Sequence, residues 1–402
     1  MTQNSTKPSL IHAVFLVSGT SIGAGMLAQP VASSMMGFLP STFMMLVSWA
    51  FMAATALVLV EVCLWMPAGS HVISMANHFL GRPGKVLAWL IYLFMAYLSL
   101  TAYISGGGDL LKNASAHLGI LDVSNWVFCA VFVLIFGIVL EVGNRAVSLL
   151  NTTLFVLLLI AYVMVIGIGL PGIKIANISE ADFSKSYIIV PLLLASFSFQ
   201  MIVPSLVGYL KQDRTKSRRA ILIGTGISFC IYVLWNAIVL GHESSLGDAA
   251  LAKAYAEGLP PTQILSGSER SWFAFNINLF SFLALVTSFI GISWGLFDFL
   301  ADGFKIQKKG ANRLLLWVLV ISVPLLLAST NPQIFISALE STGAYGDTIL
   351  NALIPISMFW VGYRFRGNPS TAKILRSRPV LITLAAFALA VIGYEVAGQF
   401  GI

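Results

Sequence analysis

Long apolar stretches separated by short polar connections occupy most of this 402-residue chain. A helix that crosses a lipid bilayer needs about 20 predominantly apolar residues, and eleven stretches reach or approach that length. They lie at residues 11–37, 40–66, 85–110, 124–141, 146–170, 187–210, 220–241, 271–300, 313–330, 333–362 and 379–398. The pattern therefore predicts an all-α integral membrane protein with eleven transmembrane helices.

Two of these stretches contain residues that interrupt a helix. The first carries Gly19-Thr20-Ser21-Ile22-Gly23-Ala24-Gly25, and the sixth carries Ser196-Phe197-Ser198-Phe199-Gln200 followed by Pro204-Ser205. Such residues are poor choices for the interior of a spanning helix, and non-helical backbone at membrane depth is tolerated only beside protein or water. Small residues also let helices approach one another closely. Taken alone, the first stretch is therefore equally compatible with a packing face and with half of a binding site.

The two interrupted stretches occupy corresponding positions in the chain. Each begins a block of five predicted helices: residues 1–170 form the first block and residues 187–362 the second, while residues 379–398 add an extra helix. Because the blocks begin on opposite sides of the membrane, they are inverted relative to each other. Paired interruptions of this kind point to a substrate site near the membrane midplane. We therefore predict a single transporter domain over residues 1–402, built as a 5+5 inverted repeat.

Composition agrees with a membrane protein and excludes an ordinary soluble one. Hydrophobic residues make up 58% of the chain and charged residues only 10%, against about 25% charged residues in soluble domains. The polar segment before the first apolar stretch carries no cleavable secretory signal, so we expect that stretch to be retained as a helix.

The formal net charge of +7 does not indicate a nucleic-acid partner, because the basic residues follow the membrane. With the N-terminus in the cytoplasm, 18 of the 23 Lys and Arg residues fall on the cytoplasmic side, in agreement with the positive-inside rule. An odd number of spans then places the C-terminus in the periplasm. The expected partners are membrane lipid and a small molecule. The one long polar connection, residues 241–271, would lie outside, with a short helix predicted over residues 251–258.

The sequence shows no combination of residues that would form a catalytic centre or a metal site. The five His residues are scattered, and the three Cys residues lie in or beside apolar runs. The motifs H-E-x-x-H and G-x-x-x-x-G-K-[ST] are absent from the sequence, and the two G-x-S-x-G patterns, at residues 19–23 and 291–295, lie inside apolar stretches. We therefore expect no enzyme activity, no metal and no cofactor.

The interrupted helices suit an amino acid as the ligand. Free backbone N–H groups at the start of a half-helix favour a carboxylate, while freed carbonyls and hydroxyls accept hydrogen bonds from an ammonium group. Aromatic residues near the breaks provide apolar walls for a ring, although most aromatic residues in such a chain serve packing. The substrate-binding candidates are Gly19, Thr20, Ser21, Gly23, Ala24, Gly25, Tyr97, Tyr103, Phe197, Phe199, Gln200, Ser288 and Trp294.

Ionisable residues inside a bilayer are candidates for coupling to an ion gradient. Glu340 and Asp347 lie seven residues apart in the tenth stretch, which would place them on one helical face, and either carboxyl could carry a proton. Alternatively, Glu340 simply ends its helix in water. Thr287 and Ser288 offer a different coupling site, because their hydroxyls could bind Na⁺ together with carbonyls of the first broken helix.

Several motifs of this chain resemble those of the bacterial hydroxy/aromatic amino acid permeases, the tyrosine- and tryptophan-specific transporters of the amino acid–polyamine–organocation superfamily. The matching motifs are Gly19-Thr20-Ser21-Ile22-Gly23-Ala24-Gly25-Met26-Leu27-Ala28-Gln29-Pro30, Thr55-Ala56-Leu57, Glu61-Val62, Ala102-Tyr103-Ile104-Ser105-Gly106, Ser196-Phe197-Ser198-Phe199, Val203-Pro204-Ser205, Thr287-Ser288-Phe289 and Gly295-Leu296-Phe297-Asp298-Phe299-Leu300-Ala301-Asp302. The resemblance implies the LeuT-type fold, a bacterial inner-membrane location and proton-coupled uptake of an aromatic amino acid. The tyrosine-specific branch is the nearest.

One position departs from the family pattern. Where members of that family carry His after the Ser-Phe-x-Phe run, this chain has Gln200, and a Gln side chain cannot titrate. Any proton or specificity role of that His therefore does not transfer to Gln200. Two alternatives to proton symport also stay open, namely a sodium-coupled symporter on the same fold and a ligand-binding receptor or channel without concentrative transport.

Overall fold

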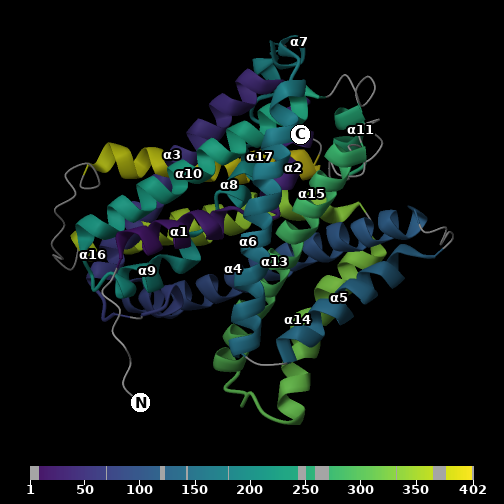
Figure 1. Ribbon diagram of the computed structural model, residues 1–402. Helices are drawn as coiled ribbons and strands as arrows, with labels where there is room; N and C mark the ends of the chain where they lie inside the picture. Colours follow the sequence, from purple (N-terminus) through teal and green to yellow (C-terminus); the bar gives the residue numbers. More distant parts are fainter. Residues whose placement is uncertain are drawn as a thin grey trace.

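The computed structural model describes residues 9–68, 70–117, 123–141, 144–179, 181–242, 250–258, 271–331, 333–364 and 377–400. Over these ranges the protein is all-helical and contains no strand (Figure 1). Within the long connection at 241–271, residues 243–249 and 259–270 lie outside the described residues. The short helix predicted in that connection is confirmed as α11 (Ala250–Ala256), and the chain turns after it at Gly258, which has a φ of +65°.

The main helices follow one another in the order predicted from the apolar stretches. They are α1 (Leu10–Ser21), α2 (Gly25–Ser33), α3 (Phe38–Leu64), α4 (Val72–His117), α5 (Asn125–Glu141), α6 (Asn144–Gly169), α7 (Ile175–Ser179), α8 (Val190–Ser196), α9 (Val203–Tyr209), α10 (Arg214–Gly241), α13 (Ser271–Gly303), α14 (Ala311–Thr330), α15 (Ile334–Ser341), α16 (Ile354–Arg364) and α17 (Arg378–Phe400). A π-helical segment, Thr342–Leu353, joins α15 to α16.

The helix lengths and composition confirm a multi-pass membrane protein. Among the described residues, eight helices are long and apolar enough to cross a membrane, and the bent pair α1 and α2 makes nine. The apolar part of α5 is shorter, covering Asn125–Gly137, and the tenth predicted stretch is divided by its π-helical segment. The total of eleven spans therefore stays a prediction.

A short helix that hydropathy does not predict precedes the third predicted helix. The range of α4 begins at Val72, but its backbone is non-helical at Gly81, where φ is +74°, so the helix after Gly81 begins close to the predicted start near residue 85. A search for apolar runs overlooks this first part, because it mixes apolar residues with polar ones such as Asn77 and His78. Glycine can adopt the left-handed conformation that the bend at residue 81 requires.

The helices pack in two groups around the broken segments. In one group α10 lies along both α1 and α3, as Figure 1 shows for α3 and α10. The indole of Trp49 donates to Thr225 Oγ1 at 3.1 Å across that contact. In the other group α13 packs against α4 and α6, and α14 packs against α4 and α5. The first broken helix therefore packs through α1 on α10.

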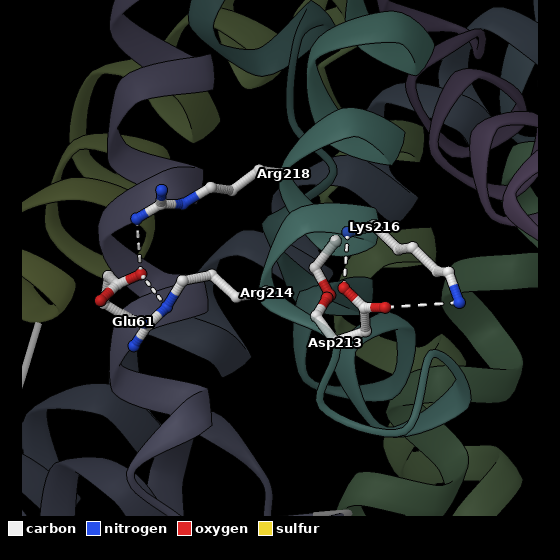
Figure 2. Close-up of polar contacts among 6 residues, drawn as sticks. Glu61, Asp213, Arg214, Lys216 and Arg218 are labelled. Atoms are coloured by element: carbon white, nitrogen blue, oxygen red, sulfur yellow. Dashed lines mark hydrogen bonds and ion pairs between the residues drawn. The ribbon is translucent and has the colours of Figure 1, made fainter. Parts of the chain in front are cut away.

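A buried ion pair joins one end of α3 to the start of α10. Glu61 is fully buried on α3, and its Oε1 lies 2.8 Å from Arg218 Nη2 and 3.0 Å from Arg214 Nε. Figure 2 shows the carboxylate between the two guanidinium groups. In the same view Asp213 caps α10, because its Oδ1 accepts from the Lys216 backbone N–H at 2.9 Å. Two α10 arginines thus compensate one buried charge.

We expect Glu61→Ala to lower the free energy of unfolding by roughly 3 kcal/mol, because removing one member of a buried ion pair leaves its partners uncompensated. Thermal unfolding of purified protein in detergent measures this loss. Asp213→Asn is the matched control, because asparagine also caps a helix and the substitution removes only an exposed ion pair with Lys216, which contributes little. Equal destabilisation by the two variants would contradict the role assigned to Glu61.

The Asp213 carboxylate also responds to pH. Hydrogen bonds from Lys216 lower the pKa of Asp213 below its ordinary value of 3.8. A carboxyl whose pKa is lower in the folded protein stabilises it above the ordinary pKa, and this stabilisation is lost as pH falls through the folded-state pKa. At neutral pH the contribution of Asp213 is therefore fully present, and both variants are compared there.

Candidate functional site

The first break separates α1 from α2 by an angle of 56°. At such a break the last carbonyls of one half-helix and the first N–H groups of the next lack intrahelical partners. The backbone N–H of Ala24 finds one across the fold, donating to Ser288 Oγ of α13 at 3.2 Å. A Cβ atom on Gly23 would lie 2.8 Å from the same oxygen, and one on Gly25 would lie 3.0 Å from Ser196 Cα. Both glycines therefore permit a close approach of neighbouring helices.

The second break separates α8 from α9, and it lies against the first. A single hydroxyl connects them: Tyr232 Oη, fully buried on α10, hydrogen-bonds to the carbonyl of Ser196 at 2.8 Å and also to the carbonyl of Ser21. These carbonyls stand at the ends of α8 and α1, where the helix dipole is negative. Tyr232 is thus the donor that the two half-helix ends share.

A cavity of about 470 Å³ lies where the two breaks meet α4, α6 and α13. Its walls are formed by Gly19, Thr20, Ser21, Ile22, Gly23, Ala24, Gly25, Tyr92, Met95, Ala96, Ser99, Tyr103, Asn151, Phe155, Ala195, Ser196, Ser198, Phe199, Met201, Ile202, Thr287, Ser288, Gly291, Ile292, Gly295, Leu339 and Thr342. Small-molecule sites have volumes of about 300–1,000 Å³ with mostly apolar walls and a few polar groups. The cavity has the size and lining of such a site.

Most of the residues predicted from the breaks line this cavity. They are Gly19, Thr20, Ser21, Gly23, Ala24, Gly25, Tyr103, Phe199, Thr287 and Ser288. The structure thus brings together residues from the first, third, sixth and eighth predicted stretches. Their roles in binding stay a prediction.

Three predicted ring contacts lie elsewhere. Tyr97 donates its hydroxyl to the backbone carbonyl of Leu319 on α14 at 2.8 Å. The lining residues of α4 fall at positions 92, 95, 96, 99 and 103, a helical stripe that excludes position 97. Phe197 is buried against Tyr232, with ring centroids 4.9 Å apart, and Trp294 stacks on a phenylalanine of its own helix. Other aromatic residues line the cavity. Which of them face it depends on the rotation of each helix about its axis, and helix packing sets that rotation.

Gln200 also lies outside the cavity lining, although it sits within the second break. Its side chain is fully buried and joins that break to α3. The amide nitrogen donates to the Met52 carbonyl at 3.1 Å and to Thr55 Oγ1 at 3.3 Å, and the amide oxygen accepts from the Phe199 N–H at 3.3 Å. Gln200 thus positions the non-helical backbone and makes no contact with the cavity.

Asp347 is fully buried in the π-helical segment, and the side chain of Ser198 lies between it and the cavity. Its Oδ1 accepts from Ser198 Oγ at 2.5 Å and from Asn351 Nδ2 at 2.5 Å. Ser198 itself lines the cavity. The second oxygen, Oδ2, is buried and has no hydrogen-bond partner among the described residues. A proton on that oxygen, or a cation beside it, would complete the site.

The prediction that Glu340 and Asp347 share one helical face is wrong. A π-helix closes i to i+5 hydrogen bonds and so has a wider turn than an α-helix, and this changes which residues align. Glu340 faces a different element, accepting from the Tyr255 hydroxyl of α11 at 2.8 Å. The two carboxyl groups therefore serve separate contacts.

Among the contributors to the site that were missed from the sequence, three stand out. Tyr232 connects the two breaks, Phe155 approaches the first break to 3.0 Å from a Cβ on Gly19, and Tyr92 lines the cavity from α4. One signal was available for Tyr232, because a tyrosine in the middle of an apolar span must find a hydrogen-bond partner. No local signal distinguishes Phe155 from the many phenylalanines that face lipid.

Comparisons with known proteins find similarity along nearly the whole chain. A model of the tryptophan/tyrosine permease family matches residues 6–395. The tyrosine-specific transport system 1 of Haemophilus influenzae is 30% identical over 94% of this chain and 96% of its own length. The tryptophan-specific transport protein of the same organism is 29% identical over 87% of this chain and 86% of its own.

A solved structure supports the fold. The crystal structure of MhsT in complex with L-phenylalanine has a TM-score of 0.61 to this protein at 13% sequence identity, covering 96% of this chain and 97% of that one. At this identity the likeness concerns the fold alone. It confirms the LeuT-type fold class.

Proposed function

The chain belongs to the tryptophan/tyrosine permease family, and on this premise we propose that it is a secondary active transporter that imports an aromatic amino acid. Tyrosine is the expected substrate, ahead of tryptophan and phenylalanine. The observation that carries the proposal is the cavity of about 470 Å³ between the two helix breaks. Its polar groups are those that an amino acid requires, and no catalytic role is proposed for them.

The charged ends of the substrate bind at the first break. The carboxylate accepts hydrogen bonds from the N–H groups at the start of α2, where the helix dipole favours a negative charge. The Ala24 N–H, which donates to Ser288 Oγ at 3.2 Å, is one such donor. The ammonium group donates to carbonyls and hydroxyls at the end of α1, where Thr20 and Ser21 line the cavity.

The aromatic ring occupies the apolar part of the cavity. Phe155, Phe199 and Tyr103 form walls from three different segments, and rings pack favourably in offset or edge-on arrangements. Asn151 also lines this space, and its Oδ1 is buried without a partner in the described part of the chain. That oxygen would accept a hydrogen bond from a phenol hydroxyl or an indole N–H.

A proton is the proposed coupling ion, and Asp347 is its proposed carrier. The carboxyl is buried, has one unpartnered oxygen, and reaches the cavity through Ser198. Protonation would weaken the acceptor at Oδ1 and release the Ser198 hydroxyl toward the substrate. Thr287 and Ser288 support the second candidate, sodium coupling, because both line the cavity beside the end of α1.

Transport proceeds by alternating access in the bacterial inner membrane, with the N-terminus in the cytoplasm. The cavity is lined by the first half of α6, at Asn151 and Phe155, and by the second half of α13, at Gly291–Gly295. In the proposed orientation both halves face the cytoplasm, so the arrangement is inward-facing. On the opposite side α11 packs against α2 and holds Glu340 through Tyr255.

Uptake by purified protein in liposomes tests this proposal. With the outside acidic, we expect accumulation of labelled tyrosine that collapses when a protonophore removes the gradient, and no accumulation of labelled glutamine. A folded sample that takes up none of the three aromatic amino acids would refute the proposal. A requirement for Na⁺ would favour the Thr287 and Ser288 site, and binding without accumulation would identify a receptor or channel.

A further inference from the structure

A second cavity opens on the lipid-facing surface of the protein, between α5 and α14. It has a volume of about 480 Å³ and is lined by Val133, Leu134, Gly137, Gly310, Arg313, Leu314, Trp317, Val318, Ile321 and Ser322. None of these residues lines the central cavity. Leu134, Leu314 and Val318 expose more than half of their surface, as expected for side chains that face lipid. We call this feature the α5–α14 groove.

One end of the groove is basic. Arg313 lies in the first turn of α14, and the connection before it carries Lys305, Lys308 and Lys309. Lys308 is held by Asp298 at 2.6 Å, and the Arg313 guanidinium lies 6.0 Å from the centre of the Phe297 ring. A guanidinium has five N–H donors and matches the oxygens of a phosphate in pairs. The groove therefore offers a phosphate-binding group at its mouth and an apolar channel behind it.

Trp317 provides a second polar group inside the groove. It follows Arg313 by four residues on α14 and so lies one turn further along the same face. The side chain is only 8% exposed, and its indole N–H is buried without an acceptor in the portion of the chain that the structure describes. Leaving such a donor unpaired is unfavourable. An acceptor on a molecule in the groove would satisfy it.

We propose that the α5–α14 groove binds one anionic phospholipid. The phosphate pairs with Arg313, an ester carbonyl accepts from the Trp317 indole, and an acyl chain lies along Val133, Leu134 and Val318. Basic pockets between membrane helices on the cytoplasmic side favour anionic lipid headgroups, and the α13–α14 connection lies on that side in the proposed orientation. The inference requires the membrane location but not the transport activity.

Gly137 allows a direct test. A Cβ atom there would meet no other atom within 4 Å, so Gly137→Leu fills the groove without displacing protein. Gly393→Leu on α17 is the matched control, because that position is equally open and lies on a different helix. Arg313→Gln removes the positive charge without filling the groove. The three variants separate the apolar and the ionic parts of the proposed site.

Native mass spectrometry of protein incubated with phosphatidylglycerol or phosphatidylcholine of identical acyl chains measures the binding. We expect wild-type protein and Gly393→Leu to retain one phosphatidylglycerol with about a tenfold preference, equivalent to about 1.4 kcal/mol. Arg313→Gln should lose the preference, and Gly137→Leu should retain neither lipid at this site. Equal retention of the two lipids by wild-type protein, or unchanged binding in both groove variants, would overturn the proposal. Uptake assays on the same samples report separately on transport.

Discussion

Gly23→Leu is expected to reduce substrate affinity and uptake by about 100-fold while the protein still inserts and folds. A Cβ atom at position 23 would lie 2.8 Å from Ser288 Oγ, and the rest of a leucine would enter the cavity. There the leucine side chain would take up space that the substrate needs, and the expected 100-fold loss of affinity corresponds to about 2.8 kcal/mol. The substitution also displaces the hydroxyl that holds the Ala24 N–H.

Binding of labelled tyrosine to purified protein, together with liposome uptake, measures this effect. Gly226→Leu on α10 is the control, because a Cβ at that position meets nothing within 4 Å, and it should retain wild-type affinity. Elution as a single species in detergent establishes folding for both variants. Unchanged affinity in Gly23→Leu would show that the first break is not the substrate site.

Asp347→Asn is expected to abolish accumulation driven by a pH gradient while preserving exchange of substrate across the membrane. Asparagine has the same shape, and its side-chain oxygen can still accept hydrogen bonds from Ser198 and Asn351, which now reach Asp347 Oδ1 at 2.5 Å. It cannot bind and release a proton. The proposed coupling therefore fails, whereas the substrate cavity keeps its lining.

Two assays on one preparation separate these effects. Accumulation under an imposed pH gradient should fall at least tenfold, equivalent to about 1.4 kcal/mol of lost coupling, and counterflow at equal pH should change less than twofold. Glu340→Gln is the control, because Glu340 bonds to Tyr255 on α11 and does not line the cavity. Full accumulation by Asp347→Asn, or its loss in Glu340→Gln alone, would contradict the assignment to Asp347.

The two helix breaks were predictable because their cause is local. Glycines and hydroxyl residues between positions 19 and 25, and a proline at 204, disfavour continuous helix whatever surrounds them. Accordingly α1 ends at Ser21 and α8 ends at Ser196. The part of α4 before Gly81 was missed, because its turns lack the apolar run by which a membrane helix is recognised.

Which side of each helix lines the cavity could not be predicted from the sequence. Tyr97 and Tyr103 are both tyrosines in the middle of α4, yet only Tyr103 lines the cavity. The difference is the rotation of α4 about its axis, which its contacts with α13 and α14 determine. The π-helical turn around Asp347 likewise changes the alignment of its side chains, and nothing in the sequence pattern indicated it.

By itself the sequence determined the membrane class, the order of the helices, the positions of both breaks and the family resemblance, because each depends on residue types within one segment. Only the tertiary structure decided which side chains meet at the breaks. Ser198 and Asp347 are 149 positions apart, and Gln200 and Met52 are 148 positions apart. Such contacts arise because every buried polar group in a membrane must find its partner within the protein, and only the packing of the helices selects which partner that is.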